Sequence, residues 1–180
     1  MNNLEKNNSR PAKWFAIKTR QDFRAEEALK PFCDEVFFPK ETVRLQSGRK
    51  RKKALIPHVL FIKIEHDEAL DLEQRSRNLS EIPLTFWIYR FPYDSEIREI
   101  PQSTISLLKM LTADDSTQCE IFNKTDFKEK ERVRIIGGPY QGYEGFVQRV
   151  KKNKHVVVRI EGICLVLLPF IHPDLLHKIE

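Results

Sequence analysis

The sequence predicts an α+β fold in two parts: an N-terminal α/β sandwich with an antiparallel sheet, and a small C-terminal all-β barrel. Two observations predict this. Strand and helix patterns alternate through the first 111 residues, whereas only short strand patterns with turns between them follow residue 126. A third is the charge, because an acidic stretch of net charge −3 (111–126) separates two blocks of net charge +4 each. Two domains joined by a linker are expected to look like this.

These patterns set the expected boundaries. The expected parts are a disordered tail at 1–12, a first domain at 13–111, a linker at 112–126 and a second domain at 127–180.

The first domain is expected to open with a strand at 13–19 and an amphipathic helix at 20–32, whose apolar residues recur near helical spacing. The following helix, at 67–77, has acidic residues early and arginines late, which suits the helix dipole. A last helix, at 101–111, has Pro101 in its first turn. Between these helices we expect strands at 36–38, 59–64 and 85–90, and a hairpin with arms at 41–45 and from 54 onward. The hairpin tip, 47–53, is too charged to pack. We expect it to be mobile and to meet nucleic acid without reading its sequence.

The second domain centres on a strand, a glycine-rich turn and a second strand over 132–147. Val133 and Ile135 alternate with polar residues, so one face of the first strand is buried. Gly137-Gly138-Pro139 is a strong turn signal, and Gly142 and Gly145 give backbone freedom where the bent second strand begins. The expected strands are 132–136, 145–150, 155–160, 163–168 and 175–179.

Composition excludes several classes of protein. No apolar run approaches the roughly 18 residues that a membrane helix needs. The first eleven residues are polar and do not form a signal peptide. The cysteines (Cys33, Cys119 and Cys164) are far apart, and the five histidines are scattered, so neither a disulfide framework nor a metal site is expected. No nucleotide-binding loop or catalytic triad is recognisable. We therefore expect a monomeric cytoplasmic protein that is not an enzyme and has no cofactor or membrane partner.

The segment 132–147 resembles the KOW motif of transcription elongation factors and certain ribosomal proteins. Trp14-Phe15-Ala16-Ile17, the Phe38-Pro39 step, the basic hairpin and Pro57–Ile62 resemble the N-terminal (NGN) domain of the NusG family. The resemblance covers roughly 13–180 and implies a transcription elongation factor. Pro57-His58-Val59 stands where the family usually has Pro-Gly-Tyr, and Ile88–Ile100 lacks the usual glycine-containing turn.

These departures favour a specialised paralogue, similar to the UpxY-type regulators of capsule operons or to RfaH, that suppresses pausing or termination at particular operons. Two alternatives stay open. The first alternative is a housekeeping elongation factor, and the second is a ribosome- or RNA-binding protein that carries a KOW module.

The resemblance implies two surfaces on the NGN domain. Trp14, Ile56, Pro57 and Val59 match an apolar patch that contacts the clamp helices of the largest polymerase subunit, with Trp14 partly exposed; simple core packing is the competing interpretation. The second surface is basic and faces upstream or non-template DNA, and a solvated charged face is its alternative. It consists of Lys18, Arg20 and Arg24, extended by Arg75 and Arg77.

The resemblance gives the KOW domain a structural motif and a partner surface. The motif is Gly137, Gly138, Pro139, Tyr140, Gly142 and Gly145, whose glycines permit the turn. The partner surface maps to Ile160, Gly162 and Ile163, which in relatives binds a small-subunit ribosomal protein or the Rho terminator; core packing is equally compatible. Because 156–158 and 163–168 are strongly β-prone, we predict a stable barrel without the helical state known in RfaH.

Overall fold

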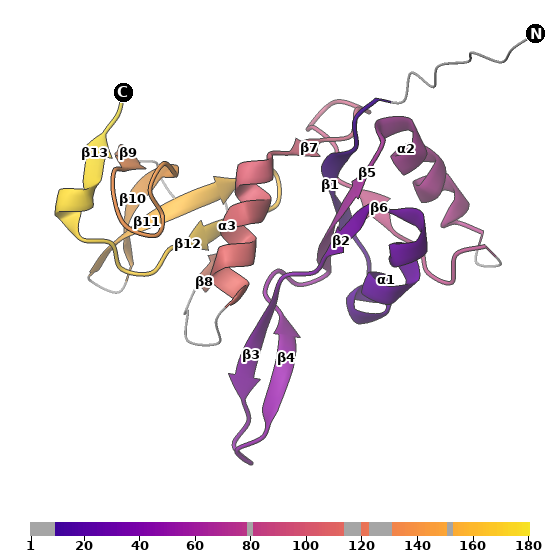
Figure 1. The fold of residues 1–180 in the computed structure, drawn as a ribbon, viewed down its shortest axis with the longest axis horizontal. Coiled ribbons are helices and arrows are strands. Elements are labelled where there is room, and N and C mark those ends of the chain that lie inside the picture. Colours follow the sequence, from indigo (N-terminus) through magenta and orange to yellow (C-terminus); the bar gives the residue numbers. More distant parts are fainter. Residues whose placement is uncertain (1–9, 79–80, 114–119, 123–130, 151–152) are drawn as a thin grey trace, which may run out of the picture. The chain divides into compact units, whose positions relative to one another are not determined.

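The computed structural model describes residues 10–78, 81–113, 120–122, 131–150 and 153–180. The chain divides into two compact units (Figure 1). The first comprises the described residues up to Pro39 together with Pro57–Gln102, and the second comprises Lys40–Ile56 together with the described residues from Ser103 onward.

The first unit is built on an antiparallel sheet whose central strands are β1 (Lys13–Lys18) and β5 (Val59–Ile64). The strand order is β2 (Glu35–Phe37), β5, β1 and β6 (Trp87–Ile88), and β7 (Glu99–Ile100) also pairs with β1. The four middle residues of β1 are all buried, so both faces of the sheet are covered there. Only the terminal lysines of β1 reach the surface.

Helices cover one face of this sheet. They are α1 (Asp22–Leu29), continued by the short helix η1 (Lys30–Phe32), and α2 (His66–Arg75). The ring of His66 meets the ring of Phe15 edge to face at 6.2 Å, so α2 lies on the face that carries Phe15 and Ile17. The side chain of Glu65 accepts hydrogen bonds from the backbone N–H groups of Asp67 and Glu68 and so caps the start of α2.

The second unit contains a six-stranded antiparallel sheet, in the order β13, β9, β10, β11, β12, β8. The strands are β8 (Glu120–Phe122), β9 (Arg132–Ile135), β10 (Glu144–Val150), β11 (Asn153–Ile160), β12 (Cys164–Leu167) and β13 (Leu176–Lys178). Its core is apolar and includes Val133, Ile135, Val156 and Val166. The unit also holds most of α3 (Gln102–Ala113), whose Ser103 carbonyl accepts a hydrogen bond from the Tyr143 hydroxyl at 3.1 Å.

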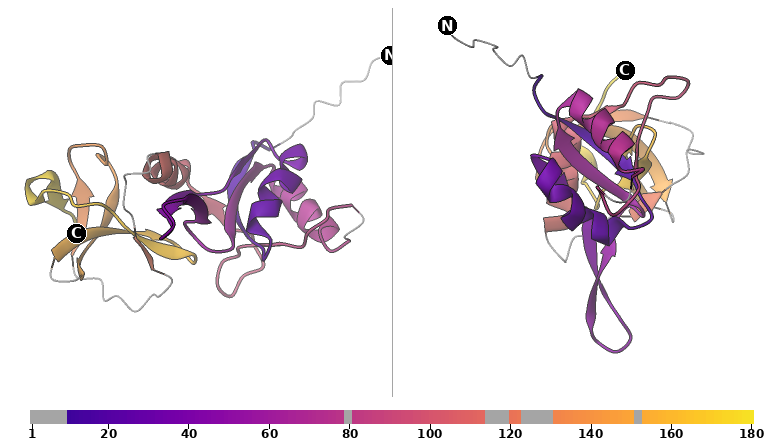
Figure 2. Two further views of the ribbon diagram at one scale, coloured as in Figure 1. Left: turned by 90° about the horizontal axis from the view of Figure 1, so that it is seen from below. Right: turned by 90° about the vertical axis from the view of Figure 1, so that its right-hand side faces the viewer.

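A separate two-stranded ribbon, residues 40–54, completes the second unit. Its strands are β3 (Lys40–Arg44) and β4 (Lys50–Ala54), which twist around each other (Figure 2). Leu45 N donates to Arg49 O, and Gly48 N donates to Leu45 O, both at 2.9 Å, so backbone hydrogen bonds close the tip. Gly48 has φ +78°, a conformation that glycine adopts without steric cost.

The predicted α+β class is confirmed, with an antiparallel sheet and helices first and an all-β region after them. The five strands expected after residue 131 are all present, with their ends shifted by at most two residues. The expected tail lies outside the described residues up to residue 9, as does most of the expected linker.

Three details of the elements were predicted wrongly. Strand β8 lies within the expected linker and pairs with β12, because three residues joining a sheet edge need no periodic pattern of their own. Residues 50–53, expected in a mobile tip, belong to β4, because a ribbon is held by backbone pairing and needs no apolar face. The expected strand at 85–90 is paired as a strand only at 87–88.

Candidate functional site

The exposed end of β1 gathers the first group of candidate residues. In the register of the sheet, Lys18 lies opposite Val59 of β5 on one side and opposite Trp87 of β6 on the other. Residues directly opposite one another in an antiparallel sheet point to the same face. Val59 is 2% exposed, Lys18 is exposed, and Trp87 is 52% exposed. An exposed indole therefore lies beside an exposed ammonium group on one face.

The neighbours of Trp87 explain its exposure. Phe86 and Ile88 are buried, and Ile88 lies opposite Ile17 on the face that α2 covers. Because side chains alternate along a strand, Trp87 must point to the other face. No role for Trp87 was predicted from the sequence, although the alternation in Phe86-Trp87-Ile88 was a signal for it.

An ion pair between buried Glu73 and partly exposed Arg90 fixes β6. Arg90 Nη2 lies 2.6 Å from Glu73 Oε2, Arg90 Nη1 donates to Glu73 Oε1 at 3.0 Å, and the Ile88 N–H donates to Glu73 Oε1 at 2.7 Å. Burial raises the pKa of the Glu73 carboxyl, but the hydrogen bonds from Arg90 and Ile88 outweigh it, so the pKa lies below its ordinary value. Glu73 is therefore ionised at neutral pH and holds the strand that presents Trp87.

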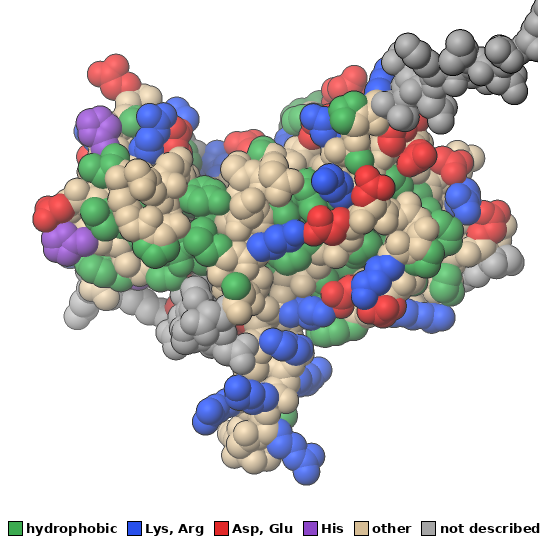
Figure 3. All heavy atoms as spheres, viewed as in Figure 1, with side chains coloured by type: hydrophobic (Ala, Val, Ile, Leu, Met, Phe, Trp, Pro, Cys, Tyr) green, Lys and Arg blue, Asp and Glu red, His purple; other side chains and the backbone are tan. Residues whose placement is uncertain are grey.

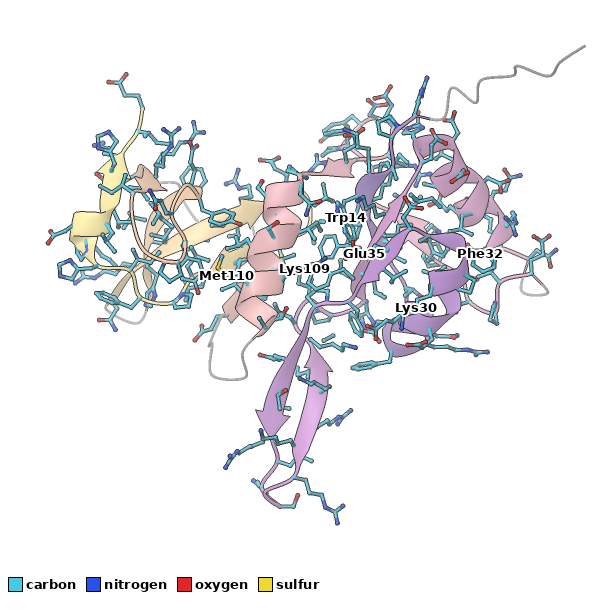
Figure 4. All side chains as sticks on the ribbon, viewed as in Figure 1. Trp14, Lys30, Phe32, Glu35, Lys109 and Met110 are labelled. Carbon is cyan, nitrogen blue, oxygen red and sulfur yellow. The ribbon has the colours of Figure 1, made fainter. Side chains whose placement is uncertain are left out.

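Of the four residues expected in the apolar patch, only Pro57 is exposed. Trp14, Ile56 and Val59 are each at most 3% exposed. The expectation that Trp14 is partly exposed is wrong for this structure. Trp14, labelled in Figure 4, lies in the buried middle of β1. Its Nε1–H donates to Gln102 Oε1 at 2.8 Å. A buried indole with a satisfied N–H group supports the fold directly.

The turn at Pro57-His58 joins this group to α1. His58 has φ +66°, in the left-handed region that side chains with a Cβ adopt at a cost of about 1–2 kcal/mol. Its carbonyl accepts from Thr19 N at 3.0 Å, and its own N–H donates to Asp22 Oδ2 at 3.2 Å. The backbone conformation explains why glycine suits this position in the Pro-Gly-Tyr pattern.

The five residues of the expected basic surface differ in their surroundings. Lys18, Arg20 and Arg24 are exposed at the end of β1 and in α1, and Arg77 is exposed after α2. Arg75 is engaged by its neighbours, because its Nε donates to Glu81 Oε2 at 2.8 Å and its guanidinium lies 5.6 Å from the centre of the Phe32 ring. Lys18, Arg20 and Arg24 therefore form a group close in sequence, and Arg75 is the weakest member of the set.

Backbone geometry gives the glycines of the second unit distinct roles. Gly138 and Gly142 have φ +80° and +89° in the turn between β9 and β10. Gly145 is needed for a different reason, because a Cβ there would lie 2.5 Å from Val157 O and 2.9 Å from Val156 Cγ1 of β11. Its lack of a side chain lets β10 approach β11 closely.

The expected partner surface of the second unit is only partly accessible. Ile160 ends β11 and is 3% exposed, whereas Gly162, with φ +73°, is exposed in the turn and Ile163 is half-buried. Phe170, at 68%, is the more exposed apolar side chain, and it lines a cavity of about 290 Å³ together with Val133, Val156 and Leu176. Phe170 was not predicted from the sequence, because a lone aromatic after a strand has no period that reveals its exposure.

A candidate metal site is not found in the described part of the chain, and the Cys33 thiol is not activated. None of its residues form a group of three or more histidine, cysteine, aspartate or glutamate side chains suited to a metal ion. Burial, with smaller effects from Asp34 and Glu68, raises the pKa of the Cys33 thiol to about 12, so this thiol stays protonated at neutral pH. Nor is any helix among the described residues long and apolar enough to cross a membrane.

Comparison with known proteins identifies the family of the chain. A family model described as transcription termination factor nusG matches residues 12–109. The transcription termination/antitermination protein NusG of Borreliella burgdorferi is 41% identical over 56 residues, which are 29% of this chain and 30% of that protein. A solved structure entitled "Domain interaction in Thermotoga maritima NusG" aligns with a TM-score of 0.47 and 16% identity, covering 94% of this chain and 98% of that one. Because the family model spans more than half of the chain, the chain belongs to the NusG family of transcription termination and antitermination factors.

Proposed function

We propose that this chain is a transcription elongation regulator that binds RNA polymerase through its first unit and suppresses pausing or termination. The match of the family model to residues 12–109, which spans the whole sheet and its helices, carries the proposal. We propose that the clamp helices of the largest polymerase subunit contact the NGN domain, as the family resemblance implies. Regulation then follows from preferential binding to one conformation of the elongation complex.

The apolar part of the polymerase surface is proposed at Pro57 and Trp87. Both are exposed, and the register of β5, β1 and β6 puts Trp87 on the same face as Val59. Trp14, Ile56 and Val59 are buried and are not part of this proposed surface. An exposed tryptophan can be fully desolvated by a partner and is a frequent hot spot. We therefore propose Trp87, in place of Trp14, as the aromatic residue that contacts the polymerase.

The basic part of this surface is proposed to contact upstream or non-template DNA. Lys18 lies beside Trp87, Arg20 lies between β1 and α1, and Arg24 lies in the first turn of α1. Phosphate contacts from such side chains give a salt-dependent affinity without sequence preference. Arg77 extends this surface more readily than Arg75, whose guanidinium already donates a hydrogen bond to Glu81.

The second unit is proposed to recruit a further partner, a small-subunit ribosomal protein or Rho, through Gly162 and Ile163 in the turn between β11 and β12. Ile160 supports them from the core. Tethering that partner to the polymerase would raise its local concentration.

We also propose that the chain is an operon-specific paralogue of the UpxY or RfaH type, with capsular polysaccharide genes as the expected target. Recruitment to one DNA element separates this from the genome-wide occupancy of a housekeeping factor.

A single-round transcription assay with purified bacterial polymerase tests the proposal. The native protein is expected to shorten pauses, and Trp87→Ala to weaken polymerase binding by about 30-fold, as for a hot spot of about 2 kcal/mol. Tyr93→Ala is the matched control, because Tyr93 is a fully exposed aromatic residue in the loop that follows β6. Equal behaviour of the two variants would remove Trp87 from the interface. Absence of any polymerase binding by the native protein would overturn the proposed function.

A further inference from the structure

The ribbon holds the whole positive excess of the chain. Its fifteen residues, 40–54, include seven basic and one acidic side chain, for a net charge of +6. The chain as a whole has a net charge of +5, so the other 165 residues carry 24 basic and 25 acidic side chains and a net charge of −1. Figure 3 shows these basic side chains gathered along β3 and β4. The ribbon therefore differs in charge from the rest of the molecule.

The pairing of β3 with β4 divides these charges between two faces. On one face Thr42 lies opposite Lys52 and Arg44 lies opposite Lys50, with Lys40 opposite Ala54 at the base. We call this the cationic face, because its four charged side chains are all basic: Lys40, Arg44, Lys50 and Lys52. The other, mixed face pairs Glu41 with Lys53, whose charged groups lie 3.8 Å apart, and Val43 with Arg51.

The cationic face combines one hydrogen-bonded pair, in which Lys52 donates to Thr42 Oγ1 at 2.6 Å, with one pair of like charges. Arg44 and Lys50 lie directly opposite each other, and like charges in such a cross-strand pair are destabilising. Residues 44–53 are all exposed, so burial of an apolar face does not offset the repulsion. A polyanion laid along this face would relieve it. The chemistry of the face therefore points to phosphates.

We propose that the cationic face of the ribbon docks on duplex DNA, with its lysines and arginine on the phosphates that border the major groove. Five residue pairs at about 3.4 Å each give a ribbon about 17 Å long, and a B-form major groove about 12 Å wide admits a two-stranded ribbon. The deep, narrow major groove of an RNA duplex does not. Between the four cations this face offers only Thr42, so it contacts the backbone and does not read sequence.

The test measures binding of the full chain to a fluorescent 20-base-pair duplex over a range of salt concentrations, without polymerase. Two triple variants are matched in charge: R44S/K50S/K52S on the cationic face and R49S/R51S/K53S, which removes two mixed-face cations and the neighbouring Arg49. The first is expected to lower the slope of log affinity against log salt by about 2.7, or 0.9 for each lost phosphate contact. It should also bind at least tenfold more weakly than the second triple variant. Equal losses in the two variants would show diffuse attraction and overturn the assignment of a face.

Competition identifies the ligand class. Unlabelled duplex DNA is expected to displace the labelled duplex at lower concentration than duplex RNA, single-stranded DNA or polyglutamate of equal charge. Displacement by duplex RNA or polyglutamate at the same concentration would overturn the assignment to duplex DNA. Since no polymerase is present, failure here and failure of polymerase binding are separate results. The thermal unfolding of both triple variants, followed by circular dichroism, checks that each is folded.

Discussion

The ribbon and the β9–β10 hairpin are both antiparallel pairs closed by glycine turns, yet different forces shape them. In the β9–β10 pair, Val133 and Ile135 are buried and Gly145 lies against the backbone of β11. In the ribbon, the strands are paired by their backbones, and the exposed residues, 44–53, include basic side chains and no acidic ones. The contrast suggests that substitutions in the first hairpin change the free energy of unfolding, whereas substitutions in the second change what the protein binds.

The largest expected effect is that of Gly145→Ala. The new Cβ would meet the backbone oxygen of Val157 at 2.5 Å, and backbone cannot move aside as a flexible side chain does. Strands β10 and β11 would have to separate, so we expect a loss of about 3 kcal/mol or more, at the upper end of overpacking effects. Urea unfolding of the full chain, monitored at the β-sheet signal, measures it.

Gly142→Ala is the control for this prediction. Gly142 has φ +89°, and nothing lies within 4 Å of the position that the new methyl group would take, so only backbone strain of about 1–2 kcal/mol is expected. If the two variants lost the same stability, close approach of β11 would not be the reason for Gly145. Gly48→Ala in the ribbon, with φ +78° and open space around it, should perturb the tip and leave the unfolding of the barrel unchanged.

Sequence alone predicted the packed elements better than the unpacked ones. Val133 and Ile135 alternate because one face of β9 is buried, and that alternation is readable without coordinates. Strand β4 lacks such an alternation of apolar and polar residues, because four of its five residues are basic and exposed. The candidate site residues were also predicted unevenly. The burial of Trp14 depends on strands distant in sequence, such as β5 and β7, whose register the sequence does not contain.

A buried charge sharpens the comparison with the exposed charges of the ribbon. Glu73→Gln keeps an acceptor for Ile88 N–H but removes the charge that pairs with Arg90, so we expect a loss of about 2 kcal/mol at neutral pH. Glu81→Gln is the control, because the side chains of Arg75 and Glu81 are 40% and 46% exposed and such solvent-screened pairs contribute much less to stability. Chemical denaturation of both variants measures the difference. Equal losses would mean that burial adds nothing to the Glu73–Arg90 pair.

The pH dependence of the Glu73 variant follows from the direction of its pKa shift. The folded protein holds the pKa of Glu73 below the ordinary value of 4.5, so its stabilising contribution is complete above that pH. The contribution is lost as the pH falls through the lower, folded value. The difference in stability between the native protein and Glu73→Gln should therefore be constant from pH 7 to about 5 and shrink below pH 4.5. A difference that grew on acidification would contradict the shift.

His58→Gly tests a turn that is fixed by backbone hydrogen bonds. The variant removes the strain of φ +66° and keeps the bonds from Thr19 N and to Asp22, but glycine makes the unfolded chain more flexible. The strain of about 1–2 kcal/mol exceeds that entropy term, so we expect a gain of up to about 1 kcal/mol. A rise in the midpoint of thermal unfolding confirms it. A fall would show that the His58 side chain, whose Nδ1 lies 3.7 Å from Asp22 Oδ2, contributes more than the strain.

The smallest expected effect on stability is that of the cationic-face triple R44S/K50S/K52S. Its residues are exposed, and Arg44 and Lys50 are paired like charges, whereas Lys52 donates a hydrogen bond to Thr42. Removing all three should therefore change the free energy of unfolding by no more than about 0.5 kcal/mol. Thermal unfolding at low salt, where charge repulsion is strongest, is the sensitive measurement. A clear destabilisation would mean that these cations support the fold, and the two hairpins would then differ less than their packing indicates. Unchanged stability together with lost DNA binding would leave recognition as the reason for placing four cations on one face.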